Sequence, residues 1–177
     1  MKHAVLVIDI QNALVNPTPK PFEIDTVMQR INQVTKLARI INTPVIFIQH
    51  ECPNSVVEHG TEGWQLPCDL EVDAKDHIVR KTTPDSFLRT NLEDLLKSLE
   101  VKNVTICGYA SEFCVDTTVR RAAALGYNVQ IVSDAHTTHD KEHASACDIR
   151  KHHNATLPNV TSFGSKITSI PAQNIEL

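Results

Sequence analysis

Three residues whose side chains could act together as a base, a cation and a nucleophile follow three separate apolar runs of the sequence. Asp9 ends the run "AVLVID", Lys81 ends the run "HIVRK", and Cys114 follows the run "NVTICG" after a short turn. A thiol attacks a carbonyl carbon only as the thiolate, so a base must take its proton or its pKa must fall. We expect Cys114 to attack, Asp9 to shuttle the proton and Lys81 to stabilise the negative charges. This chemistry is acyl transfer through a thioester.

The residues around Cys114 predict how the thiol is activated. A helix is expected over Cys114–Leu125, so the thiol would lie at a helix N-terminus, where free amides and the helix dipole stabilise a thiolate. The backbone amides of Ala110 and Cys114 are candidates for binding a developing oxyanion. Each side chain also has a structural alternative. A single cysteine after a strand is commonly a small buried hydrophobic residue.

Apolar runs alternate with helical periodicity along the chain. The predicted strands are Ala4–Asp9, Pro44–His50, His77–Lys81, Asn103–Gly108, Asn128–Ala135 and Asn159–Phe163. The predicted helices are Ile24–Ile41, Asn91–Leu99, Cys114–Leu125 and Lys141–Ala155. This pattern is typical of a doubly wound α/β domain, with a mostly parallel sheet of about six strands and helices on both faces. Functional groups in such sheets lie at the carboxyl ends of the strands, which places Asp9, Lys81 and Cys114 on one edge.

Composition limits the possible partners and location of the protein. The length of 177 residues fits a single domain covering residues 1–177, and a net charge of −4 without a long basic run argues against nucleic acid or a membrane as partner. The apolar runs are too short to span a bilayer, and the N-terminus shows no signal peptide, so we expect a cytoplasmic protein. The five cysteines, an odd number without C-x-x-C spacing, are expected as free thiols.

Four segments of the sequence resemble the isochorismatase-like cysteine hydrolases, the superfamily that includes nicotinamidases and N-carbamoylsarcosine amidases. They are "LVIDIQNAL", "VRKTTPDSF", "CGYASEFCV" and "ALGYNVQIVSDA", and they occur in the family's order over nearly the whole chain. The resemblance implies a Rossmann-type isochorismatase-like fold and a catalytic triad of Asp9, Lys81 and Cys114. It also implies an oxyanion hole formed by the amides of Ala110 and Cys114, and a cis peptide bond between Tyr109 and Ala110. A small-molecule substrate and a homo-oligomer, either a dimer or a tetramer, are further implications.

The metal-binding motif of the nicotinamidases is missing from the sequence. Those relatives carry an Asp-x-His and further histidines after the second strand, where this chain reads "IQHECPNSVVEHG". His50, Glu51, Cys52 and His59 are residue types that can ligate zinc, but their spacing matches no known ligand pattern. We therefore expect no bound metal and no cofactor, and a metal-free member of the superfamily rather than a nicotinamidase.

Four further residues are candidates for substrate binding: Gln11, Trp64, Tyr109 and Glu112. Trp64 lies in "HGTEGWQL", a segment that resembles a loop of the metal-free relatives, and could stack on a planar substrate. Its alternative is a loop residue that packs on the core. Glu112 replaces the aspartate that is common two residues before the nucleophile in the family. It either forms hydrogen bonds near the pocket or braces the turn.

We therefore predict a cofactor-free cysteine hydrolase that cleaves a C–N bond of a small amide, lactam or carbamoyl compound. Two alternatives stay open. The first is an isochorismatase-type vinyl ether hydrolase, in which the aspartate acts as the acid and the cysteine is dispensable. The second is a non-catalytic binding protein with the same fold.

Overall fold

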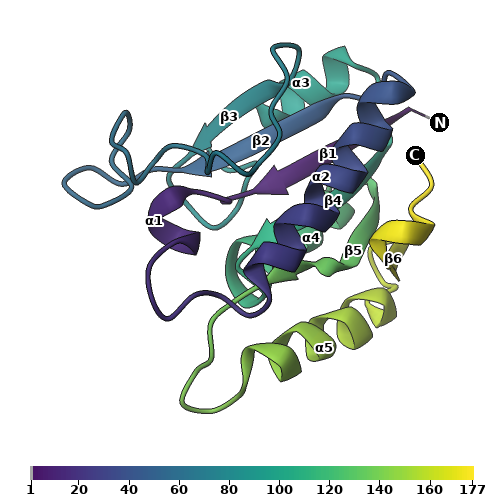
Figure 1. Cartoon of the computed structure of the whole chain (residues 1–177). Helices are drawn as coiled ribbons and strands as arrows, with labels where there is room; N and C mark the ends of the chain where they lie inside the picture. Colours follow the sequence, from purple (N-terminus) through teal and green to yellow (C-terminus); the bar gives the residue numbers. More distant parts are fainter. Residues whose placement is uncertain (1) are drawn as a thin grey trace.

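The computed structural model describes residues 2–177 and contains one six-stranded sheet in the order β3-β2-β1-β4-β5-β6 (Figure 1). Every neighbouring pair of strands is parallel. The strands are β1 (His3–Ile8), β2 (Val45–His50), β3 (His77–Lys81), β4 (Asn103–Tyr109), β5 (Asn128–Thr137) and β6 (Ile167–Ile170). The predicted doubly wound parallel sheet is confirmed.

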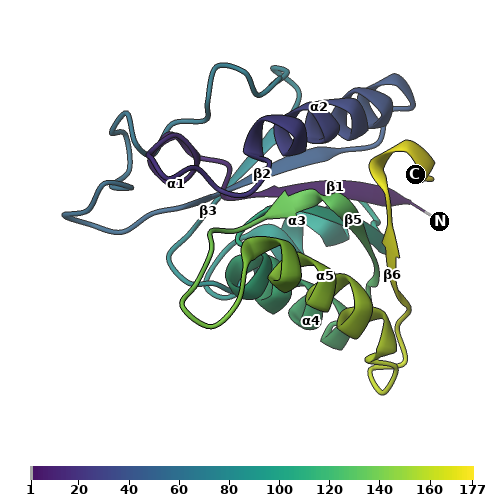
Figure 2. The ribbon, with the colours of Figure 1, turned by 60° about the horizontal axis from the view of Figure 1, so that its bottom comes forward.

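Helices cover both faces of this sheet (Figure 2). Helix α2 (Ile24–Ile40) packs on one face together with the C-terminal turn η3 (Ala172–Asn174), and its buried apolar residues recur at three- and four-residue steps. The other face is covered by α3 (Leu92–Ser98), α4 (Asp116–Ala124) and α5 (Ala146–Thr156). Three short elements complete the fold: α1 (Asn12–Val15), η1 (Ser111–Val115) and η2 (Leu157–Asn159).

The strand order places β1 and β4 side by side at the middle of the sheet. The chain leaves β1 toward one face and β4 toward the other, so this pair is the switch point of the sheet, the place where open α/β sheets bind their ligands. Gly108 permits the close approach of the two strands. A Cβ atom at this position would lie 2.1 Å from the carbonyl oxygen of Ile8, and the residue has a φ of +124° that disfavours any side chain.

Two predicted element boundaries are wrong. The sixth strand is Ile167–Ile170 rather than Asn159–Phe163, because Pro158 lies in the turn η2 and the buried Ile167 is the residue that pairs with β5. The last long helix begins at Ala146 rather than at Lys141. Ser145 caps it, since its hydroxyl oxygen accepts a hydrogen bond from the amide of Asp148.

The predicted helix over Cys114–Leu125 is divided into two elements. A π-helical turn, η1, spans Ser111–Val115, and the regular helix α4 follows directly from Asp116. Gly126, with a φ of +92°, follows the end of α4 in a left-handed conformation, which glycine adopts without a steric cost. Cys114 therefore lies inside a π turn and not at the first residue of an α-helix.

Candidate active site

Asp9, Lys81 and Cys114 meet at the carboxyl edge of the sheet. The ammonium group of Lys81 donates a hydrogen bond to Asp9 Oδ2 at 2.7 Å and another to Cys114 Sγ at 3.3 Å. The side chains of Asp9 and Lys81 are almost completely buried, whereas Cys114 is partly exposed. The structure thus brings together the three residues that the sequence singled out, with only the thiol open to a ligand.

Two further groups fix the position of Lys81. Its ammonium group donates to the carbonyl oxygen of Thr83 at 3.1 Å and lies 3.5 Å from Nδ1 of His50, the last residue of β2. Burial, and next to it the charge of Lys81, lowers the pKa of His50, so its imidazole is neutral and accepts from the ammonium group. Sequence reasoning considered His50 only as a metal ligand. The pairing of β2 with β3, which sets His50 opposite Lys81, is what places it here.

The backbone at the end of β1 turns the carboxylate of Asp9 into the site. Asp9 has a φ of +52°, in the left-handed region, which aspartate tolerates better than most residues with a side chain. Its Oδ2 atom pairs with Lys81, while its buried Oδ1 atom has no hydrogen-bond partner among residues 2–177. The free oxygen is available to take a proton from a neighbouring group.

The state of the Cys114 thiol differs from the sequence expectation of a thiolate stabilised by a helix N-terminus. Burial raises the pKa of Cys114 to about 12, and the charge of Asp9 adds to the increase against the opposing effect of Lys81. The physical reason is that the charge of Asp9 offsets the stabilisation of a thiolate by Lys81, so the cost of burying the thiolate prevails. The resting thiol is protonated, and a base must take its proton during attack.

The turn before Cys114 presents the backbone amides that the sequence named as oxyanion donors. The peptide bond between Tyr109 and Ala110 is cis. The carbonyl oxygen of Ala110 accepts hydrogen bonds from the amides of Phe113 and Val115, each at 3.1 Å. These bonds use two of the donors in the turn, and the amides of Ala110 and Cys114 stay the candidates for the oxyanion hole.

Gln11, which the sequence named as a candidate for substrate binding, forms hydrogen bonds within the protein. It is fully buried, and its side-chain nitrogen donates to the carbonyl oxygens of His50 at 2.9 Å and Trp64 at 3.0 Å. Its side-chain oxygen accepts from the amide of His50 at 2.8 Å. Both amide hydrogens are used, so Gln11 offers a ligand no free donor. It joins the end of β2 to the loop that carries Trp64.

The other three candidates for substrate binding differ in the contacts that they make within the protein. The hydroxyl of Tyr109 lies 2.9 Å from His139 Nδ1. Glu112 accepts from the Thr138 hydroxyl at 2.8 Å and pairs with Lys141 at 3.2 Å. The Trp64 ring is partly exposed, and its buried indole nitrogen has no hydrogen-bond partner in the described part of the chain.

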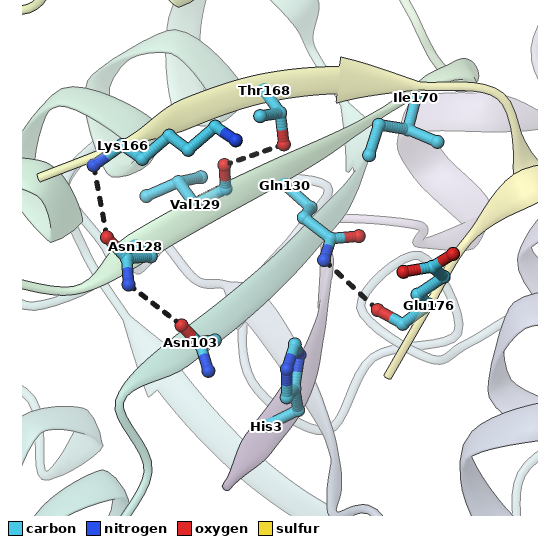
Figure 3. A pocket seen from close by; sticks show the side chains of 9 residues that line it. All are labelled: His3, Asn103, Asn128, Val129, Gln130, Lys166, Thr168, Ile170 and Glu176. Carbon is cyan, nitrogen blue, oxygen red and sulfur yellow. Dashed lines mark hydrogen bonds between the residues drawn. The ribbon is translucent and has the colours of Figure 1, made fainter. Parts of the chain in front are cut away.

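Other features of the molecule lie apart from this site. A hollow of about 420 Å³ lies at the amino ends of β1, β4 and β5, and its lining includes the first residues of these strands, His3, Asn103 and Asn128 (Figure 3). Within residues 2–177, no group of three or more His, Cys, Asp and Glu side chains is arranged to hold a metal ion. No helix in the same range is both long and apolar enough to cross a lipid bilayer. All five cysteines are free.

Comparison with known proteins agrees with the arrangement of the strands. The model of the isochorismatase domain matches residues 3–161, which include every residue of the candidate site. The chain belongs to the isochorismatase family. A crystal structure of an isochorismatase family protein superposes on it with a TM-score of 0.85 at 34% identity, over 95% of this chain and 97% of the other.

Two named relatives and one further solved structure are also similar to this isochorismatase-family chain. A streptothricin hydrolase of Streptomyces noursei is 36% identical over 77% of this chain and 50% of its own length. The chain thus spans about half the length of that relative. The uncharacterized isochorismatase family protein YrdC of Bacillus subtilis is 31% identical over 76% of this chain and 73% of its own. The N-carbamoylsarcosine amidase of Thermoplasma acidophilum shares the fold, with a TM-score of 0.82 at 21% identity, and covers 100% of both chains.

Proposed function

We propose that this protein is a cysteine hydrolase that cleaves a C–N bond of a small amide, lactam or carbamoyl compound. The observation that carries the proposal is the double contact of Lys81, which reaches Asp9 at 2.7 Å and the Cys114 sulfur at 3.3 Å. A carboxylate, an ammonium group and a thiol in contact at the switch point of the sheet provide a base, a cation and a nucleophile.

In the proposed reaction, the Cys114 sulfur attacks the carbonyl carbon of the substrate while the thiol proton passes to Asp9. The free Oδ1 atom of Asp9 is the acceptor, because Oδ2 is occupied by Lys81. The oxygen of the tetrahedral intermediate receives hydrogen bonds from the amides of Ala110 and Cys114. The C–N bond then breaks, the proton on Asp9 passes to the leaving nitrogen, and a thioester on Cys114 remains.

A water molecule completes the proposed cycle. Asp9, again a carboxylate, takes a proton from the water as its oxygen attacks the thioester carbon. The tetrahedral intermediate collapses with release of the carboxylic or carbamic acid, and the sulfur regains a proton from Asp9. The ammonium group of Lys81 limits the cost of the negative charge that moves between the carboxylate and the sulfur.

The substrate contacts belong to the same proposal. Tyr109, Glu112 and Trp64 are the side chains that we propose to set specificity around Cys114. The name of the relative at 36% identity makes streptothricin the first compound to assay. Nicotinamide, N-carbamoylsarcosine and a vinyl ether such as isochorismate complete a first panel.

Two variants decide between the proposal and its alternatives. Loss of turnover in both Cys114→Ala and Asp9→Asn, with the fold retained by circular dichroism, supports the cysteine hydrolase. Activity that persists in Cys114→Ala but disappears in Asp9→Asn would support vinyl ether hydrolysis instead. Absence of turnover of every panel compound by the wild-type protein would support a binding protein.

A further inference from the structure

A chain of buried side chains ties the π turn η1 to the body of the protein, and the proposed mechanism does not use it. Ser111, the first residue of η1, has its hydroxyl 2.8 Å from Nδ1 of His136 on β5. Nε2 of His136 lies 3.0 Å from Oδ1 of Asn154 on α5. The order Ser–His–Asn resembles a nucleophile with its base, but Ser111 and His136 have no exposed surface. Ser111 is therefore not an attacking group.

The direction of every hydrogen bond in this chain is fixed by its far end. The side-chain nitrogen of Asn154 donates to the carbonyl oxygen of Ser133 at 2.8 Å, and the Ser169 hydroxyl donates to Asn154 Oδ1 at 2.8 Å. Asn154 Oδ1 is thus an acceptor, and Nε2 of His136 must be the donor. In a neutral imidazole with its hydrogen on Nε2, the Nδ1 atom carries a lone pair and no hydrogen. The hydroxyl of Ser111 therefore donates to Nδ1 of His136.

A second contact holds the next residue of the same turn. The hydroxyl of Thr138, which directly follows β5, donates to Glu112 Oε1 at 2.8 Å. Two successive residues of η1 are thus fixed by two residues at the end of β5. The same turn carries the Cys114 sulfur and the amides of Ala110 and Cys114, so its position decides where the thiol and the oxyanion donors lie.

We propose that His136 is a positioning residue that holds η1 in place, so that the Cys114 thiol stays beside Asp9 and Lys81. The expected loss of turnover rests on the proposed function, whereas the expected change in the reactivity of the Cys114 thiol does not. Displacement of reacting groups by about 1 Å can cost about 10²-fold in rate. If η1 is released, the thiol also leaves the buried surroundings that keep it protonated, and it becomes more reactive toward an alkylating reagent.

Three variants test this role with a matched control. Ser111→Ala removes the donor, and His136→Gln places an amide near Asn154 but leaves no acceptor at the position of Nδ1. His136→Asn is the control, because its side-chain oxygen lies close to the position of Nδ1 and keeps an acceptor for Ser111. Iodoacetamide alkylation at pH 8, followed by peptide mass spectrometry, reports on Cys114. The fully buried Cys107 reports on general unfolding.

We expect Cys114 in Ser111→Ala and His136→Gln to react at least about tenfold faster than in the wild type, with Cys107 still protected. His136→Asn should stay within about threefold of the wild type. With p-nitrophenyl acetate as an acyl probe, kcat should fall by about 10²-fold in the first two variants, with KM changed much less.

Three results would overturn the role of His136: unchanged Cys114 alkylation in Ser111→Ala and His136→Gln, equal behaviour of His136→Asn and His136→Gln, or alkylation of Cys107 together with Cys114. The last would show that His136 only stabilises the whole fold. The alkylation assay needs no substrate. Retained turnover in Cys114→Ala would therefore overturn the proposed function and leave this test intact.

Discussion

The ammonium nitrogen of Lys81 lies 2.7 Å from the carboxylate of Asp9, although strand β2 separates the strands that carry the two residues. Lys81 therefore extends past the end of β2 to reach the centre of the sheet, where its contact with the Cys114 sulfur completes the site. Both charged side chains are almost entirely excluded from solvent, so neither can lose its partner without a large cost in free energy.

Removal of the charge of Asp9 is predicted to have opposite effects on catalysis and on thiol reactivity. The carboxylate raises the pKa of Cys114, so Asp9→Asn lowers this pKa and increases the thiolate fraction at pH 8. Alkylation of Cys114 by iodoacetamide should become faster, while turnover falls by about 10²- to 10⁴-fold for lack of a proton acceptor. Alkylation as slow as in the wild type would show that burial raises the pKa of Cys114 without a contribution from the charge of Asp9.

Removal of the cation is predicted to destabilise the fold. Lys81→Met leaves the buried carboxylate of Asp9 without a partner, and such a change typically costs about 3–5 kcal/mol of unfolding free energy. The double variant Asp9→Asn/Lys81→Met contains no buried charge and should recover most of this loss. Urea unfolding of the three proteins checks the prediction. If Lys81→Met were as stable as the wild type, water would have to solvate the carboxylate of Asp9, and the prediction would be wrong.

The protonated thiol predicts a loss of stability in alkaline solution. The pKa of Cys114 is about 12 in the folded protein, whereas a thiol in the unfolded chain has a pKa of about 8.5, so the folded state binds more protons between these values. The stabilisation is fully present below pH 8.5 and declines as the pH rises toward 12. From pH 7.5 to pH 10, the wild type should lose about 2 kcal/mol more than Cys114→Ala. Equal losses in both proteins would contradict the raised pKa.

The buried His136 predicts a loss of stability in mild acid. Burial is the main cause that lowers the pKa of His136 to about 4, with Arg150 and His153 on α5 adding to the effect and the Asn154 hydrogen bond and Asp134 opposing it. Its stabilisation is present above pH 6.5, the ordinary histidine value, and is lost as the pH falls toward 4.

Urea unfolding at pH 7.5 and pH 5 should show a loss of about 2 kcal/mol that arises from His136. The variant His136→Asn has no group that titrates there and is the control. A loss of the same size in the variant would assign the acid sensitivity to other groups.

The positions of the three central residues could be predicted because each follows an apolar run that forms a strand. Parallel strands have their carboxyl ends on one edge, so the order of residues along the chain was enough to place Asp9, Lys81 and Cys114 together. The same logic located five of the six strands to within about two residues. Strand β6 was not predicted, because Ile167 is the only buried residue of this strand and the sequence there has no apolar run.

The chemical state of the site could not be predicted from residue order. The pKa of Cys114 depends on how deeply the thiol is buried and on the pairing of Asp9 with Lys81, and neither is visible in a sequence. The roles of Gln11 and His136 depend on which backbone or side-chain atoms lie next to them. Those partners are 18 to 53 residues away along the chain.

The most direct measurement of the central claim is the hydrolysis of streptothricin, nicotinamide and N-carbamoylsarcosine by the wild type and by Cys114→Ala, side by side at pH 7.5. The account predicts that the wild type cleaves the C–N bond of at least one compound and that the variant, with its fold intact by circular dichroism, loses that activity. Equal hydrolysis by both proteins, or none by the wild type, would contradict it.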